Sequence, residues 1–317
     1  MKKDLLYVMY MGGPDSIEGI EEFLFNLFSD RTIIDFHVGS RLQTFIAKKI
    51  AKKRSIKVAP EYQKIGGCSP QLPYLKSLLE KITPKYQELT GRQLVTDIGM
   101  CYYHPYIEDS VKKHEGVDYE NIYVTTMYPQ YSYTTTGVCL SRFEKAQNFC
   151  KEPVIVKDWY MDEKYNKCIA DRILKAAEKL GKKISECHVL FSAHSLPEYT
   201  VKKGDQYTQQ INEQMNHLVS LTNPKSHNLA YQSRTGPVKW VGPYTDKELQ
   251  RLADERVDNI IVVPISFVSD HIETLIELDE QYMPAVREAG LNIVRIESLN
   301  DSDDFADALL SIFSLSS

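Results

Sequence analysis

Residues 260–281 have the sequence IIVVPISFVSDHIETLIELDEQ, and this stretch decides the fold of the chain. Its first four residues are β-branched and apolar, which is typical of a strand that is buried on both faces. Such strands belong to parallel sheets that helices cover on both sides. Ser269 and Asp270 follow as favourable N-cap residues, and a helical segment comes after them. The stretch therefore predicts a parallel α/β sheet with a polar helix at the carboxyl end of one strand.

The helical segment carries His271, Glu273, Glu277 and Asp279, so imidazole and carboxylate groups gather just past the strand. In open α/β sheets, ligands bind at the carboxyl ends of the strands. Glu273 and Glu277 are four positions apart, which places both on one helix face, close enough to share a cation. An ordinary amphipathic helix with a solvated acidic face is the alternative. This stretch alone does not decide between a site and a solvated face.

The whole chain has the size and composition of a two-domain globular protein. It has 317 residues and a formal net charge of -5, which argues against a nucleic-acid-binding protein. Uninterrupted apolar runs stay well below the roughly 18 residues that a membrane span needs. Asp4 interrupts the apolar start, which is therefore expected to be a strand and not a signal peptide. The six cysteines form no Cys-x-x-Cys pair, which indicates free thiols in a reducing, cytoplasmic setting.

Short apolar segments with the character of buried strands recur in both halves of the chain. They cover residues 5–11, 94–101, 122–127, 153–159, 189–193, 230–233, 260–264 and 293–297. Helical segments separate them, and this alternation is typical of doubly wound α/β domains. We therefore expect an α/β fold of two similar Rossmann-like domains, each a four-stranded parallel sheet flanked by helices, with a cleft between them. The first domain covers residues 1–160, with the C-terminal helix 303–317 packing back on it, and the second covers 161–302.

Polar and aromatic groups follow several of these strands. Two strands of the first half end in the turns CYYHPY and YPQYSYTTTG, and tyrosine rings with polar edges suit a large planar ligand. In the second half, the sequence SAHSLP places His194 at the carboxyl end of a strand. A structural histidine with both ring nitrogens hydrogen-bonded is the alternative. Ser192 and Ser195 lack the G-x-S-x-G pattern of a hydrolase nucleophile.

Six blocks together resemble the ferrochelatase family, enzymes that insert ferrous iron into a porphyrin late in haem synthesis. The blocks are MGGP (11–14), IGGCSP (65–70), YPQYSYTTTG (128–137), SAHSLP (192–197), YQSRTGPVKWVGPYTD (231–246) and PISFVSDHIETLIELD (264–279). Each block alone is a weak match, but their order along nearly the whole chain is specific. The fold of that family, two Rossmann-like domains around a porphyrin cleft, agrees with the predicted strands.

The resemblance implies a set of site residues. His194 and Glu273 are implied to be catalytic, and His194, Glu273 and Glu277 are implied to bind the metal. Metal insertion displaces two pyrrole protons, so it requires a base that is neutral near pH 7, and imidazole meets that need. Which of His194 and Glu273 first takes a proton or holds iron stays open. The residues implied to bind the porphyrin are Met11, Arg54, Tyr102, Tyr128, Ser132, Trp240 and His271.

The chain departs from the family pattern at several positions, among them the segment GDQYTQQ at residues 204–210, which replaces the more usual GDPYPQ. Cys101 stands where some members have Arg, which puts one propionate or metal-entry contact in doubt. Gln281 stands where related proteins continue the acidic path, and an amide binds cations less well than a carboxylate. Tyr133 occupies the position of an early cluster cysteine, and the sequence stops at Ser317, whereas animal members of the family carry a cysteine-rich extension. We therefore expect no 2Fe-2S cluster and no required cofactor, with Fe²⁺ as a substrate.

Residues 23–36 are strongly apolar and align with the lip of the family's cleft. An exposed patch of this kind indicates peripheral membrane contact, and packing in the first domain's core is the alternative. Met11 and the lack of a second Arg cluster favour protoporphyrin IX over coproporphyrin. We expect a monomeric, cytoplasmic enzyme that forms protohaem at the inner face of the cytoplasmic membrane. The alternatives are a coproporphyrin ferrochelatase, a tetrapyrrole chelatase for cobalt or nickel, and a non-catalytic haem or porphyrin carrier.

Overall fold

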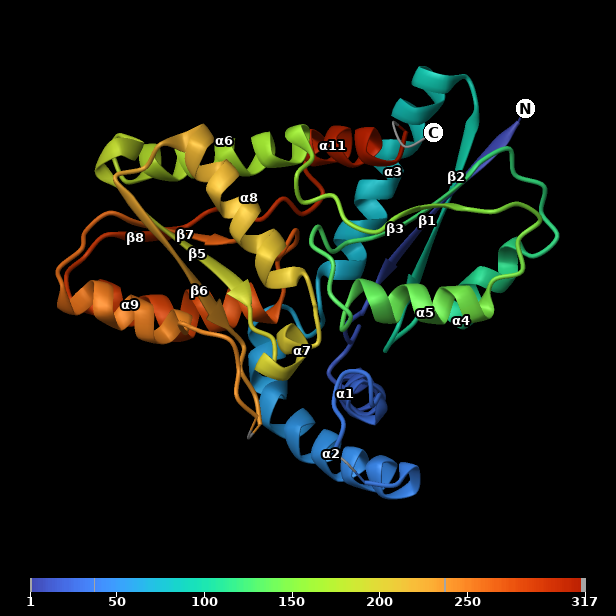
Figure 1. Ribbon diagram of the computed structural model, residues 1–317, viewed down its shortest axis with the longest axis horizontal. Coiled ribbons are helices and arrows are strands. Elements are labelled where there is room, and N and C mark those ends of the chain that lie inside the picture. Colours follow the sequence, from blue (N-terminus) through green and yellow to red (C-terminus); the bar gives the residue numbers. More distant parts are fainter. Residues whose placement is uncertain (1, 37, 237, 315–317) are drawn as a thin grey trace. The chain divides into compact units, whose positions relative to one another are not determined.

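The computed structural model describes residues 2–36, 38–236 and 238–314. The chain divides into two compact units, each of which holds one sheet (Figure 1). Unit 1 comprises Met1–Tyr128, Ser132–Asp158 and Leu310–Ser317, and unit 2 comprises Pro129–Tyr131 and Trp159–Leu309.

Unit 1 is built on a parallel sheet of four strands in the order β2-β1-β3-β4. The strands are β1 (Lys3–Tyr10), β2 (Gln93–Met100), β3 (Ile122–Thr126) and β4 (Val154–Val156). The helices are α1 (Gly19–Ser29), α2 (Ser40–Lys64), α3 (Gln71–Thr90), α4 (Ile107–Ser110), the 3-10 turn η1 (Val111–His114) and α5 (Thr136–Ala146). Alternate residues of β1 point to opposite faces of the sheet. On one face, Leu5, Tyr7 and Met9 lie in an apolar cluster with side chains of α4 and α5. Leu6 and Val8, on the other face, are also fully buried.

Unit 2 repeats this architecture with the strand order β6-β5-β7-β8, again all parallel. The strands are β5 (His188–His194), β6 (Ser226–Gln232), β7 (Ile260–Pro264) and β8 (Ile293–Arg295). The helices are α6 (Glu163–Lys179), the 3-10 turn η2 (Ile184–Glu186), α7 (Glu198–Lys202), α8 (Tyr207–Thr222), α9 (Thr245–Asp254), the π-helix η3 (Glu273–Tyr282), α10 (Met283–Glu288) and α11 (Asp303–Ser314). Helices α6 and α8 lie on one side of this sheet and α9 on the other (Figure 1).

The two four-stranded parallel sheets confirm the predicted fold class. Residues 260–263 of β7 are fully buried, as their apolar sequence predicts for a strand covered on both faces. Strand β6 begins at Ser226, four positions before the predicted start at 230. Its first residues are polar and exposed, so they carry no apolar pattern that predicts a strand.

The acidic helix after β7 differs from the prediction. Residues Glu273–Tyr282 form the π-helix η3, not an α-helix, and no side chain caps its start at Ile272. The predicted N-cap residue Asp270 acts differently: its Oδ1 accepts a hydrogen bond from Thr274 Oγ1 at 3.0 Å and pairs with Arg295 at 3.0 Å. Contacts of the preceding loop therefore orient this helix. Short π-helical segments occur frequently at functional sites.

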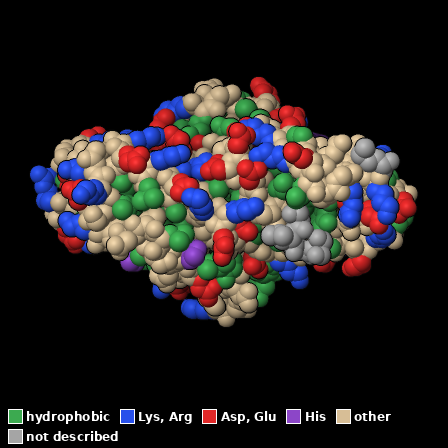
Figure 2. Space-filling view, turned by 90° about the horizontal axis from the view of Figure 1, so that it is seen from above, with side chains coloured by type: hydrophobic (Ala, Val, Ile, Leu, Met, Phe, Trp, Pro, Cys, Tyr) green, Lys and Arg blue, Asp and Glu red, His purple; other side chains and the backbone are tan. Residues whose placement is uncertain are grey.

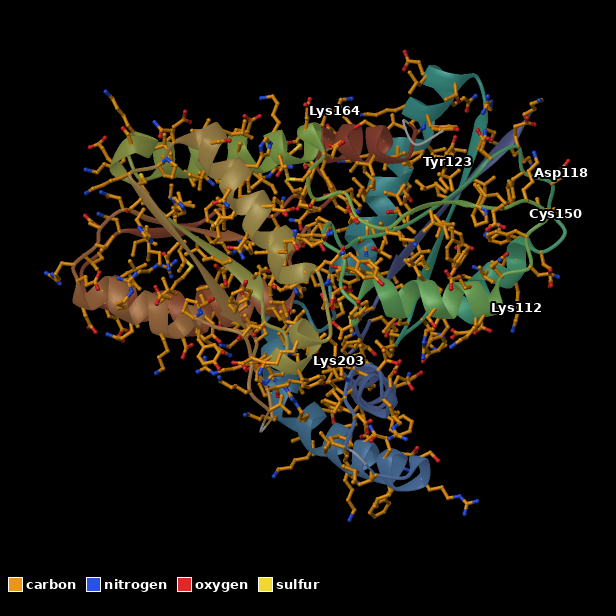
Figure 3. All side chains as sticks on the ribbon, in the orientation of Figure 1. Lys112, Asp118, Tyr123, Cys150, Lys164 and Lys203 are labelled. Atoms are coloured by element: carbon orange, nitrogen blue, oxygen red, sulfur yellow. The ribbon has the colours of Figure 1, made fainter. Side chains whose placement is uncertain are left out.

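The last residues of α11 belong to unit 1. The ring of Phe313 lies 5.7 Å from that of Tyr86 and 5.4 Å from that of Tyr123. Phe313 is fully buried, so this aromatic cluster is part of the core of unit 1. The side chain of Tyr123 is labelled in Figure 3.

Candidate functional site

His194 is the last residue of β5 and stands at the carboxyl edge of the sheet of unit 2. Its backbone N–H donates to Ser266 Oγ at 2.9 Å, and its ring Nδ1 lies 2.6 Å from the carbonyl oxygen of Ser195. A carbonyl oxygen only accepts hydrogen bonds, so Nδ1 carries a proton and Nε2 is the atom that can exchange one. The side chain is about a third exposed, at 35%. The structure thus presents one reactive nitrogen of His194.

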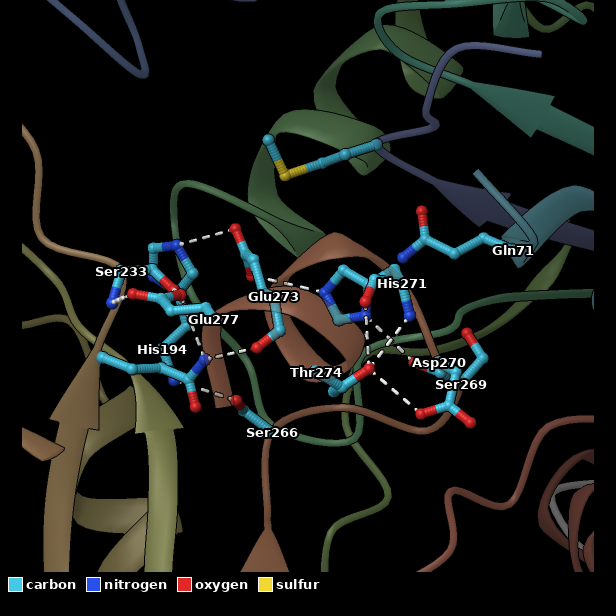
Figure 4. Close-up of polar contacts among 12 residues, drawn as sticks. Gln71, His194, Ser233, Ser266, Ser269, Asp270, His271, Glu273, Thr274 and Glu277 are labelled. Atoms are coloured by element: carbon cyan, nitrogen blue, oxygen red, sulfur yellow. Dashed lines mark hydrogen bonds and ion pairs between the residues drawn. The ribbon is translucent and has the colours of Figure 1, made fainter. Parts of the chain in front are cut away.

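Glu273, the first residue of η3, lies between two imidazoles (Figure 4). One carboxylate oxygen is 3.6 Å from His194 Nε2, and the other is 3.3 Å from His271 Nε2. The ring Nδ1 of His271 lies 3.0 Å from the carbonyl oxygen of Ser269, so this imidazole is also oriented by a backbone acceptor. His194, Glu273 and His271 therefore form one connected group.

The charges of this group are set by its geometry. Burial alone would lower the pKa of His194, but the adjacent Glu273 carboxylate raises it from 6.5 to about 9. Burial would raise the pKa of Glu273, yet His194 and then His271 hold it below its usual range. These shifts favour an imidazolium beside a carboxylate near pH 7, whereas the sequence predicts a neutral imidazole.

Glu277 has a different environment from Glu273. Its carboxylate accepts hydrogen bonds from Ser233 N at 2.9 Å, from Gln232 Nε2 at 3.2 Å, and from the hydroxyls of Ser233 and Tyr282. Burial, and next the charge of Glu277, raise the pKa of Tyr282 above its usual value, so this phenol stays a donor. Glu277 is therefore held by protein donors on several sides.

The predicted metal set of His194, Glu273 and Glu277 does not form a closed three-ligand group. Among the residues that the structure describes, no three His, Cys, Asp or Glu side chains are arranged to hold a metal ion. His194 and Glu273 adjoin, whereas the Glu277 carboxylate is engaged by Ser233 and Tyr282.

Aromatic rings surround His194 within unit 2. The rings of Trp240 and Phe267 lie 6.4 Å and 6.3 Å from its imidazole. The indole N–H of Trp240 donates to the carbonyl oxygen of Thr235 at 2.8 Å, which fixes the ring. Phe267 also packs edge-on against His271, with ring centres 4.5 Å apart. Trp240 was expected from the sequence, and Phe267 was not.

The candidates from unit 1 fall into two groups. Met11, Tyr102 and Tyr128 lie together: Met11 N–H donates to the Tyr128 hydroxyl at 3.1 Å, and Tyr102 N–H donates to Met11 O at 3.0 Å. Tyr102 is fully buried and Ser132 is 1% exposed. Arg54 lies apart on α2, with its guanidinium 5.6 Å from the ring of Phe28.

Cys101, the first departure from the family pattern, faces another thiol. Its Sγ lies 3.3 Å from Sγ of Cys139, and both side chains are buried. A guanidinium is nevertheless present, because Arg142 of α5 donates to the carbonyl oxygen of Cys101 and lies 5.1 Å from the ring of Tyr102. The sequence offered no signal for this position of Arg142, since 41 residues separate it from Cys101.

Sequence reasoning also missed Gln232, Ser233, Ser266 and Tyr282. Gln232 and Ser233 lie inside the block at 231–246, so the block was a signal that went unused at these two positions. Tyr282 directly follows the exposed Gln281, which stands where the resemblance implies that related proteins continue the acidic path. Within the π-helix, the Tyr282 hydroxyl donates to Glu277, five positions earlier in the chain.

Fold and site together define a class of α/β proteins that carry an imidazole–carboxylate pair at the carboxyl edge of a sheet. Such a pair can transfer protons and can contact a divalent metal. The profile of the ferrochelatase family matches residues 4–315. The chain belongs to the ferrochelatase family, which confirms the resemblance seen in the sequence. It is therefore an enzyme of haem biosynthesis that inserts a metal ion into a porphyrin, with porphyrin and iron as its substrates.

Curated relatives match along their whole length or most of it. A ferrochelatase of Synechocystis is 36% identical over 313 residues, covering 95% of this chain and 79% of the relative. Ferrochelatases of Aquifex aeolicus and Geobacter metallireducens are each 37% identical, over 316 and 318 residues. These matches cover 98% of this chain in both cases, and 97% and 98% of the relatives.

Two solved structures share the fold. CbiX, described as the terminal enzyme for biosynthesis of siroheme in denitrifying bacteria, has a TM-score of 0.53, 11% identity, and coverage of 99% of both chains. SirB from Bacillus subtilis with Fe³⁺ has a TM-score of 0.53 and 12% identity, over 100% of this chain and 96% of that one. At these identities the likeness shows the fold alone. Within the described residues, no helix is both long and apolar enough to cross a membrane.

Proposed function

We propose that this enzyme inserts Fe²⁺ into protoporphyrin IX and releases two protons to form protohaem. The observation that carries the reaction is the His194–Glu273 pair, which places a carboxylate and an imidazole 3.6 Å apart at the edge of a sheet. Metal insertion needs groups that accept the pyrrole protons and that bind iron weakly enough to release it. Oxygen and imidazole ligands hold iron less firmly than thiolates would.

The charges of the pair support an order of proton transfers in which Glu273 acts first. At pH 7 the Glu273 carboxylate is ionised and His194 is an imidazolium, so Glu273 is the base that is available first. His194 must release its Nε2 proton to solvent, which its 35% exposed side chain can reach, before that nitrogen can take a pyrrole proton or contact iron. His271, on the other carboxylate oxygen, would keep Glu273 oriented while the proton moves.

Protoporphyrin IX carries two carboxylates and coproporphyrin carries four. The charges near the candidate porphyrin-binding residues favour protoporphyrin IX. Near Tyr102 and Trp240, three basic side chains already pair with acidic ones: Arg142 with Glu108 at 3.6 Å, Arg234 with Asp246 at 2.7 Å, and Lys239 with Glu198 at 2.8 Å. A propionate would have to displace these partners. Protoporphyrin IX, with two propionates and apolar vinyl groups, needs fewer cations than coproporphyrin does.

The substrate proposal is tested by comparing kcat/KM for protoporphyrin IX and coproporphyrin III with ferrous iron under anaerobic conditions. Loss of the free-base absorption reports metal insertion directly. We expect the value for protoporphyrin IX to be the higher by at least about tenfold, as for a site that must leave two extra carboxylates unpaired. A preference for coproporphyrin III would contradict the substrate, and binding of either porphyrin without metal insertion would contradict the reaction.

We further propose that helix α2, and not the segment 23–36, makes the peripheral membrane contact. Within 23–36, Phe23, Leu27 and Ile33 pack against the core of unit 1, as the packing alternative expects. On α2, Leu42, Phe45 and Ile56 are 49%, 55% and 71% exposed, and their spacing puts them on one helix face. Exposed apolar side chains of this size each contribute about 1.5–3 kcal/mol at most when buried in lipid.

The charge of the same face suits an anionic lipid surface. Its exposed basic residues are Arg41, Lys48, Lys49, Lys52, Lys53 and Lys57. No acidic residue occurs between 36 and 60, whereas acidic and basic side chains are mixed on the face shown in Figure 2. Lys49 Nζ lies 4.4 Å from the ring of Phe45, so apolar and basic groups share one surface. Basic amphipathic helices of this kind bind anionic membranes.

Vesicle sedimentation tests this contact. The wild type should bind vesicles that contain phosphatidylglycerol and bind pure phosphatidylcholine weakly. The double variant Phe45→Ser/Ile56→Ser should lose most of this binding, whereas Leu221→Ser, at a position on α8 that is 49% exposed, should keep it. Equal binding by the double variant and the wild type would contradict a role of α2.

A further inference from the structure

Gln232 ends β6 and is the neighbour of His194 in the parallel sheet, where the register pairs the two residues. Its side chain is 2% exposed, so its amide must find partners inside the protein. The oxygen accepts a hydrogen bond from Ser192 Oγ on β5 at 2.6 Å. The nitrogen donates to the main-chain oxygen of Glu273 at 2.9 Å and to Glu277 Oε2 at 3.2 Å. One buried amide thus joins the strand of His194 to the helix of Glu273.

The Gln232 amide donates to the main-chain oxygen of Glu273 and does not contact the Glu273 carboxylate. Both oxygens of that carboxylate therefore remain for His194 and His271. A contact to the carboxylate itself would instead compete with the two imidazoles for its lone pairs. The position of the first residue of η3 relative to the end of β5 consequently depends on Gln232.

Ser233 strengthens the same connection. It has φ 66°, a left-handed conformation that a residue with a Cβ atom adopts rarely. This conformation directs its N–H to Glu277 Oε1 at 2.9 Å, one turn further along η3. Two consecutive residues of the chain, Gln232 and Ser233, therefore fasten the first turn of the π-helix to the sheet. Such unfavourable backbone conformations persist where the surrounding structure holds them, frequently at functional sites.

We propose that Gln232 is a positioning residue for metal insertion, whose side-chain amide sets the separation of His194 Nε2 and the Glu273 carboxylate. The inference rests on the proposed roles of His194 and Glu273. The two groups act on the same protons, and a displacement of about 1 Å can slow a reaction by on the order of 100-fold. Loss of the amide should therefore affect the chemical step while leaving porphyrin binding unchanged.

The first test separates kcat from KM. Gln232→Met keeps the length of the side chain and removes its hydrogen bonds, and Gln232→Glu replaces the donor nitrogen with an oxygen that faces Glu277. We expect both variants to lower kcat by about 10- to 100-fold, with KM for the porphyrin unchanged. The matched control is Gln214→Met on α8: Gln214 is also fully buried, and its nitrogen donates to Asn166 Oδ1 at 3.1 Å. This control should lower the Tm without changing kcat.

The second test is a double-mutant cycle with Glu273→Gln. If Gln232 acts through Glu273, Gln232→Met should cost less than about twofold in kcat in the Glu273→Gln background. An equal loss in both backgrounds, or full activity of Gln232→Met, would overturn the inference. If Gln232→Met does not fold, the same cycle with Gln232→Glu decides. Wild-type kcat in Glu273→Gln alone would instead overturn the proposed role of Glu273, which is a separate result.

Discussion

The Nε2 atom of His194, at the end of β5, lies 3.6 Å from the carboxylate of Glu273, at the start of η3. Both residues have their second polar atom engaged: His194 Nδ1 by the carbonyl oxygen of Ser195, and the other Glu273 oxygen by His271. The reactive atoms therefore face one another and little else within unit 2. This geometry favours a protonated imidazole beside an ionised carboxylate, since each group shifts the pKa of the other towards its charged form.

Replacing His194 by Ala should abolish metal insertion while the fold is kept. The side chain is 35% exposed and contributes little packing, but it supplies the only ring nitrogen at 3.6 Å from Glu273 Oε1 among the described residues. Loss of free-base porphyrin absorption measures the activity, and far-UV circular dichroism checks the fold. Turnover at the wild-type rate by a folded variant would remove His194 from the mechanism.

The stability of the ligand-free enzyme should depend on pH through His194. A group whose pKa is raised on folding stabilises the fold below its unfolded pKa, and this contribution is lost as pH rises through the folded pKa. For His194 that window runs from 6.5 to about 9. The Tm difference between wild type and Glu273→Gln should therefore be largest near pH 6.5 and shrink towards pH 9.

Thermal unfolding in half-unit steps of pH measures this difference. Gln214→Met serves as the control, because its side chain has no charge and its Tm difference from wild type should stay constant. If the Tm difference between wild type and Glu273→Gln stays constant or grows from pH 6.5 to about 9, the His194 imidazole and the Glu273 carboxylate are not coupled in the way that the structure indicates.

Glu277→Gln should reduce stability more than activity. The carboxylate of Glu277 accepts hydrogen bonds from Gln232, Ser233 and Tyr282, and an amide would place a donor against these donors. Leaving such buried donors unpaired costs about 1–3 kcal/mol in the free energy of unfolding. We expect kcat to fall less than about tenfold, compared with about 100-fold for Glu273→Gln. Denaturant unfolding and steady-state rates measure both effects, and the reverse order of kcat losses would make Glu277 the principal carboxylate.

We also propose that the enzyme works without an iron–sulfur cluster, which would need four cysteine or similar ligands. The described cysteines include one close thiol pair, Cys101 and Cys139, and burial raises the pKa of Cys139 well above its usual value, which disfavours the thiolate. Cys150 is exposed in the loop after α5 (Figure 3). Assay of the purified, active protein should find no inorganic sulfide, and stoichiometric sulfide would contradict this proposal.

The parts of the fold and site that the sequence predicts are those with local signals. The run at 260–263 predicts β7 because a strand buried on both faces needs continuous apolar residues. His194 could be placed at a strand's carboxyl end because its block follows a second run of this kind. Local patterns of this type predict an element correctly because the residues of that element alone determine the pattern.

Other features depend on contacts between distant residues, and the sequence has no local pattern for them. The composition of 273–282 suits an α-helix as well as a π-helix, so the wider turns of η3 could not be predicted. The partners of Glu277 come from β6 and from the far end of η3. The raised pKa of His194 depends on its separation from Glu273, which only the folded chain defines.

The most direct test of the His194–Glu273 account is the initial rate of ferrous iron insertion by Glu273→Gln, measured anaerobically with the porphyrin site saturated. Porphyrin binding, followed by fluorescence quenching, should equal that of the wild type, because the substitution keeps the size of the side chain. The account predicts a rate lower by about 100-fold or more, as for the loss of a general base. A rate within about twofold of the wild type at equal porphyrin occupancy would contradict it.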